Sequence, residues 1–171
     1  KAMIIANRCV DCGECYRSCP VSAIGVEQDD LSMIFGFKTR AILIPSVLIG
    51  LFSHKIPVSA IYAALGKTGF THVYQVENTI DMVLDAYREF RQTNKQRPLI
   101  SSFCPAIVRL IQVRFPSLVD NIMRVNPPID MSALYYRKKL LAEGNDAKDI
   151  GLFYATPCAA KIAAIKSPVG E

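Results

Sequence analysis

The chain has 171 residues, about half of them apolar, and a formal net charge of +5 at pH 7. This length can bury one well-packed core and carry a small additional module. Its Lys and Arg residues are scattered rather than clustered, so we expect no nucleic-acid partner. The longest apolar run, residues 41–52, is shorter than the roughly twenty residues of a membrane-spanning helix. We therefore expect no membrane association and, from six cysteines in ligand-like settings, a reducing cytoplasmic location.

The first predicted element is a cysteine-rich loop near the N-terminus. Two-residue gaps let a tight loop place three thiolates around three corners of an iron–sulfur cube, and Gly13 can take the positive φ that such a loop needs. A structural zinc site prefers two separated C-x2-C pairs, and these thiols are too closely spaced for paired disulfides. We therefore predict a ferredoxin-type 4Fe–4S module over residues 1–34. Its ligands follow the bacterial ferredoxin spacing C-x2-C-x2-C-x3-C-P: Cys9, Cys12, Cys15 and Cys19.

The sequence leaves the fourth ligand of this cluster open. Short apolar stretches at residues 3–5 and 23–26 flank the cysteine run, and we expect them to pair as a small hairpin. In two-cluster ferredoxins the fourth cysteine of each run ligates the other cluster, yet these 171 residues contain no second run. Either Cys19 closes its own cluster, or Cys104 or Cys158 serves, or a second run lies outside this chain. Because the chain begins without an initiator Met, we expect it to be a piece of a larger protein.

Residues 35–171 are predicted to form an α/β domain. Runs typical of buried strands alternate with segments whose apolar residues recur at helical spacing. This alternation predicts a parallel sheet covered by helices on both faces. The expected strands cover residues 41–45, 71–76, 98–101 and 150–154, and the expected helices cover 58–65, 79–90, 105–115, 131–141 and 159–165.

Two further cysteines each follow an expected strand and open an expected helix. Cys104 follows the strand at 98–101, and Cys158 follows the strand at 150–154. Ligands of open α/β sheets bind at the carboxyl ends of the strands, where helix N-termini also present free N–H groups. Lys161 lies one helical turn after Cys158, so its ammonium can reach the same site. Taken singly, each cysteine would be interpreted as a small core residue. Together, and downstream of an iron–sulfur run, they predict a shared cofactor site.

The segments around these two cysteines resemble motifs of the iron-only hydrogenases. Residues 101–105, Ser-Ser-Phe-Cys-Pro, are similar to the first motif of that family, usually Thr-Ser-Cys-Cys-Pro. Residues 156–161, Thr-Pro-Cys-Ala-Ala-Lys, are similar to its second motif, Met-Pro-Cys-x-x-Lys. Segments 67–73 and 114–118 are similar as well, so with the cysteine run the resemblance covers almost the whole chain.

The resemblance implies cofactors and residue roles. Cys104 and Cys158 would be two of the four ligands of the cubane half of a hydrogenase-type cluster, which would be a second cofactor beside the N-terminal 4Fe–4S cluster. Lys161 would donate a hydrogen bond to a cyanide on the diiron half, and Ser102 would lie nearby.

The chain also departs from the family pattern. Phe103 stands where catalytic members carry the cysteine that passes protons to the diiron site, and a phenyl ring cannot carry a proton. Thr156 replaces the usual Met, and Pro127 falls roughly where the proton relay of the family has a Ser. The third motif, which supplies two more cysteines, is absent from these 171 residues. Asp85 and Glu89 lie on the helix where the family keeps relay carboxylates, but we expect them on a solvated face.

We therefore expect an iron–sulfur protein that relays electrons through its 4Fe–4S cluster to a hydrogenase-like cluster site. The departures favour redox or dihydrogen sensing, and we expect this chain alone to be inactive. The expected partners are redox proteins, either ferredoxin-like or signalling domains of the same larger chain. The alternatives are part of a catalytic hydrogenase that oxidises dihydrogen reversibly, a hydrogenase-like iron–sulfur assembly protein, and a simple electron carrier.

Overall fold

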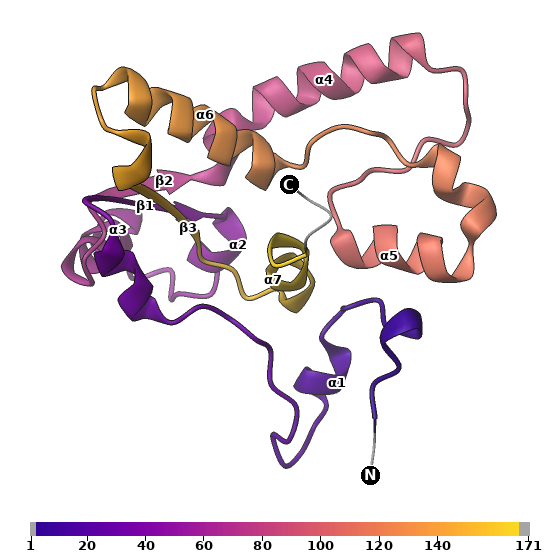
Figure 1. The fold of residues 1–171 in the computed structure, drawn as a ribbon, viewed down its shortest axis with the longest axis horizontal. Coiled ribbons are helices and arrows are strands. Elements are labelled where there is room, and N and C mark those ends of the chain that lie inside the picture. Colours follow the sequence, from indigo (N-terminus) through magenta and orange to yellow (C-terminus); the bar gives the residue numbers. More distant parts are fainter. Residues whose placement is uncertain (1–2, 168–171) are drawn as a thin grey trace. The chain divides into compact units, whose positions relative to one another are not determined.

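A computed structural model describes residues 3–167, which divide into two compact units. The cysteine unit comprises the described residues of Lys1–Gln28, Ala86–Val125 and Cys158–Glu171, and it contains all six cysteines. The sheet unit comprises Asp29–Asp85 and Asn126–Pro157 and contains the strands. Figure 1 shows their elements along the chain. One long helix, α4, has residues in both units.

The helices are α1 (Glu14–Arg17), α2 (Ser46–Ile49), α3 (Val58–Lys67), α4 (Ile80–Thr93), α5 (Pro105–Arg114), α6 (Pro128–Ala142) and α7 (Ala159–Ile165). The strands are β1 (Thr39–Ile44), β2 (His72–Gln75) and β3 (Ile150–Tyr154). Short 3-10 helices lie at Ala6–Arg8, Leu31–Gly36, Val76–Thr79, Pro116–Asn121 and Ala147–Asp149.

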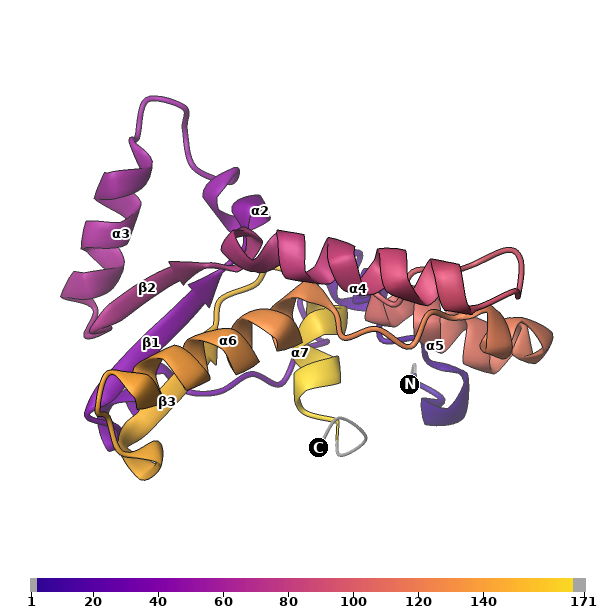
Figure 2. The same cartoon turned by 90° about the horizontal axis from the view of Figure 1, so that it is seen from above.

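Within the described residues, the strands of the sheet unit form a parallel sheet with the order β2-β1-β3. Ile42 and Ile44 of β1 pack on one face with partly buried side chains of α2 and α3. Ala41 and Leu43 project to the opposite face, where they pack with side chains of α6. Figure 2 shows α6 running along the sheet. The predicted parallel sheet with helices on both faces is therefore confirmed.

A close approach of two aromatic rings requires a glycine in β3. Phe37 and Phe153 meet edge to face, with ring centroids 5.8 Å apart. A Cβ atom on Gly151 would lie 2.6 Å from ring atoms of Phe37 and 2.7 Å from the ring of Phe153. Only a residue without a side chain therefore fits at this position.

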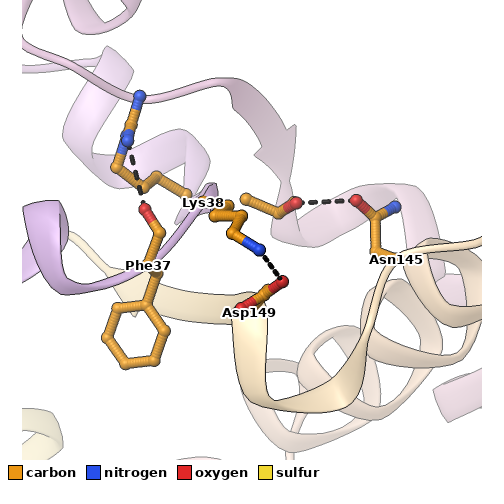
Figure 3. Close-up of polar contacts among 6 residues, drawn as sticks. Phe37, Lys38, Asn145 and Asp149 are labelled. Atoms are coloured by element: carbon orange, nitrogen blue, oxygen red, sulfur yellow. Dashed lines mark hydrogen bonds and ion pairs between the residues drawn. The ribbon is translucent and has the colours of Figure 1, made fainter.

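Polar contacts fix the beginning of β1 to the segment that leads into β3 (Figure 3). The Lys38 Nζ atom lies 2.7 Å from Asp149 Oδ2. The Thr39 hydroxyl donates a hydrogen bond of 2.7 Å to Asn145 Oδ1. These contacts help to set the register in which Thr39 pairs with Ile150.

Two predicted β elements are wrong. Residues 3–5 and 23–26 form no hairpin; Met3 is 85% exposed, and such short stretches without an apolar face to cover do not hold strands together. The strand expected at 98–101 is reduced to a single parallel bridge between Ile100 and Ile122, since Pro98 has no N–H to donate to a ladder.

The helix boundaries differ from the expected ones by a few residues. α6 begins at Pro128 rather than at residue 131, because proline is well accepted at the first position of a helix. The predicted bounds of β3 and α7 agree with the structure. Across residues 3–167, the helices are too short or too polar to cross a bilayer.

Candidate functional site

The N-terminal cysteine run folds as a loop around the short helix α1. Gly13 caps the N-terminus of α1 with a φ of +76°, as the sequence predicts, and Asp11 also has a positive φ, +54°. The four cysteines of the run are free thiols. Cys12 and Cys15 are exposed, so their sulfur atoms are accessible to a cofactor.

Backbone amides face two of the sulfur atoms in this loop. The N–H of Ala23 donates to Cys19 Sγ at 3.2 Å, and this hydrogen bond is the main reason that the pKa of Cys19 lies below its ordinary value. The N–H of Asp11 donates to Cys9 Sγ at 3.4 Å and alone would lower the pKa of Cys9. Burial and the hydrogen bond from this thiol to the Asp11 carboxylate outweigh it, so the pKa of Cys9 is raised.

The donor set of the loop fits an iron–sulfur cluster. Thiolates ligate the iron atoms of such clusters, and hydrogen bonds to sulfur tune their potential. The loop supplies both the thiols and the amide donors. Within residues 3–167, no three His, Cys, Asp or Glu side chains are grouped so as to hold a single metal ion.

Cys104 and Cys158 occupy the same local position in the structure, immediately before a helix. Cys104 is the N-cap of α5 with φ −104° and ψ 106°, and Cys158 is the N-cap of α7 with φ −98° and ψ 109°. The two helices contact each other within the cysteine unit (Figure 1). Cys104 is exposed and Cys158 is half-buried. The predicted helix starts are confirmed, but Cys104 does not follow a strand of the sheet, and a shared cluster stays a prediction.

Lys161 lies on the first turn of α7, where its backbone N–H donates to the carbonyl of Cys158 at 3.1 Å. The residue is half-buried. No carboxylate among the described residues lies within ion-pair distance of its ammonium. A cation in this setting can receive an anionic ligand.

Tyr87 of α4 contacts the three residues that precede Cys104. Its hydroxyl lies 3.0 Å from Ser101 Oγ and 3.4 Å from Ser102 Oγ, and its ring packs edge-on against Phe103. The Ser102 hydroxyl donates a hydrogen bond of 2.8 Å to the carbonyl oxygen of Val125. Tyr87 was not predicted as a site residue; its place on the apolar face of an amphipathic helix was the only signal.

The carboxylates expected on α4 are exposed, as predicted for Asp85 and Glu89. Thr156 and Pro127 are both half-buried residues of the sheet unit. Pro127 caps the N-terminus of α6.

A second polar cluster, in the sheet unit, was also missed. Glu77 Oε1 accepts a hydrogen bond of 2.8 Å from the N–H of Ser46, and Gln75 donates to the Ser46 hydroxyl at 2.8 Å. Tyr62 donates to Gln75 Oε1 at 3.3 Å, and burial raises the pKa of Tyr62. Glu77 Oε2 is buried and has no hydrogen-bond partner among the described residues. The cluster lies where β1 and β2 end, the edge at which open α/β sheets bind ligands.

Comparisons with known proteins match both parts of the chain. A family model described as "Iron only hydrogenase large subunit, C-terminal domain" matches residues 41–169, and one described as "4Fe-4S binding domain" matches residues 2–25. The NADP-reducing hydrogenase subunit HndD of Solidesulfovibrio fructosivorans is 24% identical over 179 residues. The match covers 90% of this chain and 30% of that relative, so the chain spans about a third of its length. The boundary predicted between residues 34 and 35 stays a prediction.

Proposed function

The chain belongs to the family of iron-only hydrogenase large subunits, and on this premise we propose that it passes single electrons from an N-terminal 4Fe–4S cluster to a hydrogenase-type cluster for sensing rather than turnover. It is a hydrogenase-like iron–sulfur protein that transfers electrons.

The observation that carries the proposal is that all six cysteines belong to one compact unit. In this reading the thiols of the N-terminal run hold the first cluster. Cys104 and Cys158, at the starts of two helices in contact, supply two ligands of the second. Iron–sulfur clusters, when bound, store and transfer single electrons. The remaining ligands of the second cluster must come from outside these 171 residues.

The residues around the second site have separate tasks in this proposal. The ammonium of Lys161, a half-buried residue, binds and orients an anionic ligand of the cluster. Ser102 and Tyr87 hold the segment before Cys104 in place through their hydrogen bonds and the aromatic contact with Phe103.

Two features of the same segment support sensing over turnover. Phe103 offers no group that binds or releases a proton. The nearby hydroxyl of Ser102 donates its hydrogen bond to the backbone carbonyl oxygen of Val125, an acceptor that carries no exchangeable proton. A sensor must exchange electrons with its partner but does not need fast proton transfer.

A catalytic role is the second candidate, and the relative favours it. That protein is named as a subunit of an NADP-reducing hydrogenase. Catalysis would require further cluster ligands and a proton carrier at position 103, where this chain has Phe. The expected partners remain redox proteins.

The test is an anaerobic preparation of the full-length protein, with metal analysis and electron paramagnetic resonance (EPR). We expect two iron–sulfur signals, of which the Cys104→Ser/Cys158→Ser double variant loses one and keeps the other. Under dihydrogen we expect a reversible change of the second signal with negligible turnover. Zinc in place of iron would refute the cluster assignment, and rapid dihydrogen turnover would replace sensing with catalysis.

A further inference from the structure

We propose that Gly13 is a positioning residue that sets the separation between the N-terminal cluster loop and the Cys158 site, and that its contact with Ala159 couples the two. The inference rests on the proposed function, because it assumes that a cluster occupies the N-terminal loop. Neither the resemblance to the family nor the spacing of the cysteines indicates this contact between Gly13 and Ala159.

The contact lies within the cysteine unit. A Cβ atom placed on Gly13 would lie 2.5 Å from the Cβ of Ala159 and 3.9 Å from its Cα. Real Cβ atoms do not approach so closely, so the backbone of Gly13 lies directly against the Ala159 side chain. Any side chain at position 13 would push the loop and α7 apart.

The two contacting residues are covalent neighbours of cluster-ligand candidates. Gly13 lies next to Cys12 in the N-terminal loop, and Ala159 lies next to Cys158 at the start of α7. Electron tunnelling between redox centres falls steeply as their separation grows. A contact through the smallest residue on one side and a methyl group on the other keeps this separation short.

Backbone conformation gives a second reason for a glycine at this position. The φ of Gly13 is +76°, which residues with a side chain adopt at a cost. The steric reason and the conformational reason lead to different expectations for a change at Ala159. A larger side chain there would widen the contact but would leave the φ of Gly13 and the sequence of the cysteine loop unchanged.

The experiment compares Ala159→Val with Ala164→Val, a matched control on the exposed part of α7 with the same change in helix propensity. Both changes are made in full-length protein in which Cys104 and any cysteine outside these 171 residues are replaced by Ser. The N-terminal cluster is loaded and reduced, and a nitroxide spin label is attached to Cys158. The readout is the faster magnetic relaxation that the paramagnetic cluster causes in the label.

We expect a smaller relaxation enhancement in Ala159→Val than in the unmodified protein and an unchanged one in Ala164→Val. We also expect a smaller enhancement in Gly13→Ala and its recovery in Gly13→Ala/Ala159→Gly, in which the space is restored while the strained φ remains. Equal enhancement in the two valine variants, or no recovery in the double variant, would overturn the inference. Metal analysis separates the two failures. If the N-terminal run binds no iron, the proposed function fails, whereas about four bound irons with no effect of Ala159→Val refute only the role of the contact.

Discussion

The ring of Tyr87 packs edge-on against the ring of Phe103, with centroids 5.3 Å apart and ring planes at 90°. The contact holds an aromatic ring at position 103, immediately before Cys104, where catalytic members of the family carry a thiol. The aromatic contact also explains how the bulkier side chain is accommodated. Phe103 is half-buried against α4 rather than left in solvent.

The first prediction concerns this pair. In full-length protein supplied with the diiron cofactor, Phe103→Cys should exchange dihydrogen faster than the unmodified protein, by about 10²–10⁴-fold, because a positioned proton donor contributes on that order. The measurement is dihydrogen–deuterium exchange under anaerobic conditions. Phe103→Leu is the matched control, since it removes the ring without adding a proton carrier. Equal rates in the unmodified protein and in Phe103→Cys would contradict our account of Phe103.

The second prediction concerns iron binding by the N-terminal loop. Anaerobically prepared protein should be brown and should bind about four irons through this run. Cys15→Ser should lower the iron content of this site and weaken its charge-transfer absorption. Ser18→Ala, a neighbouring exposed position, should leave both unchanged. A Cys15→Ser variant with undiminished absorption would show that another residue is the ligand.

The third prediction concerns the packing of Phe37 and Phe153 over β3. Gly151→Ala should lower the free energy of unfolding by about 1–3 kcal/mol, as overpacking does in well-packed cores. Gly66→Ala in α3 is the control, because a Cβ atom there meets nothing within 4 Å. It should raise the free energy of unfolding by up to about 1 kcal/mol through helix propensity. Denaturant titration measures both, and a neutral Gly151→Ala variant would be inconsistent with the close approach.

The fourth prediction concerns pH. The hydrogen bond from Lys38 to Asp149 raises the pKa of Lys38, so the stability that this pair contributes is fully present below the unfolded-state pKa of about 10.4. It is lost as the pH rises through the higher pKa of the folded state. The stability difference between the unmodified protein and Lys38→Met should therefore be constant from neutral pH to pH 9 and shrink above about 10.4.

Lys148→Met controls for this change, because Lys148 is exposed and forms no ion pair among residues 3–167. Its stability difference should not follow the same pH course. A Lys38→Met difference that persists unchanged through the alkaline range would argue against the ion pair.

The sequence predicted those elements whose signals are local. β3 has the expected bounds because a short apolar run defines it. α7 has the expected bounds because its run of helix-forming residues begins directly after Cys158. Cys104 and Cys158 could be placed at helix starts because Pro105 favours the first helical position and Ala159 begins a run of helix formers.

The features that were missed depend on contacts between distant segments. Tyr87 belongs to the site because α4 brings it to Ser101 and Phe103, and no spacing rule encodes that approach. The strand expected at 98–101 failed because a short apolar stretch becomes a strand only if a neighbour pairs with all of it. Glu77 lies in the 3-10 helix that follows β2, and its hydrogen-bond partner is the backbone N–H of Ser46, the first residue of α2, 31 positions earlier in the chain.

The interleaved make-up of the two units has a consequence for biosynthesis. The cysteine unit is assembled from three separate stretches of chain, which alternate along the sequence with the two stretches of the sheet unit. Contacts between residues so distant in sequence form late, because long loops must close first. The N-terminal loop leaves the ribosome well before Ala159 is synthesised, and Ala159 is the residue that the loop packs against. The loop stays without this packing partner through most of translation, so the contact between Gly13 and Ala159, and the separation of the two cysteine sites that it sets, can form only after α7 has been synthesised.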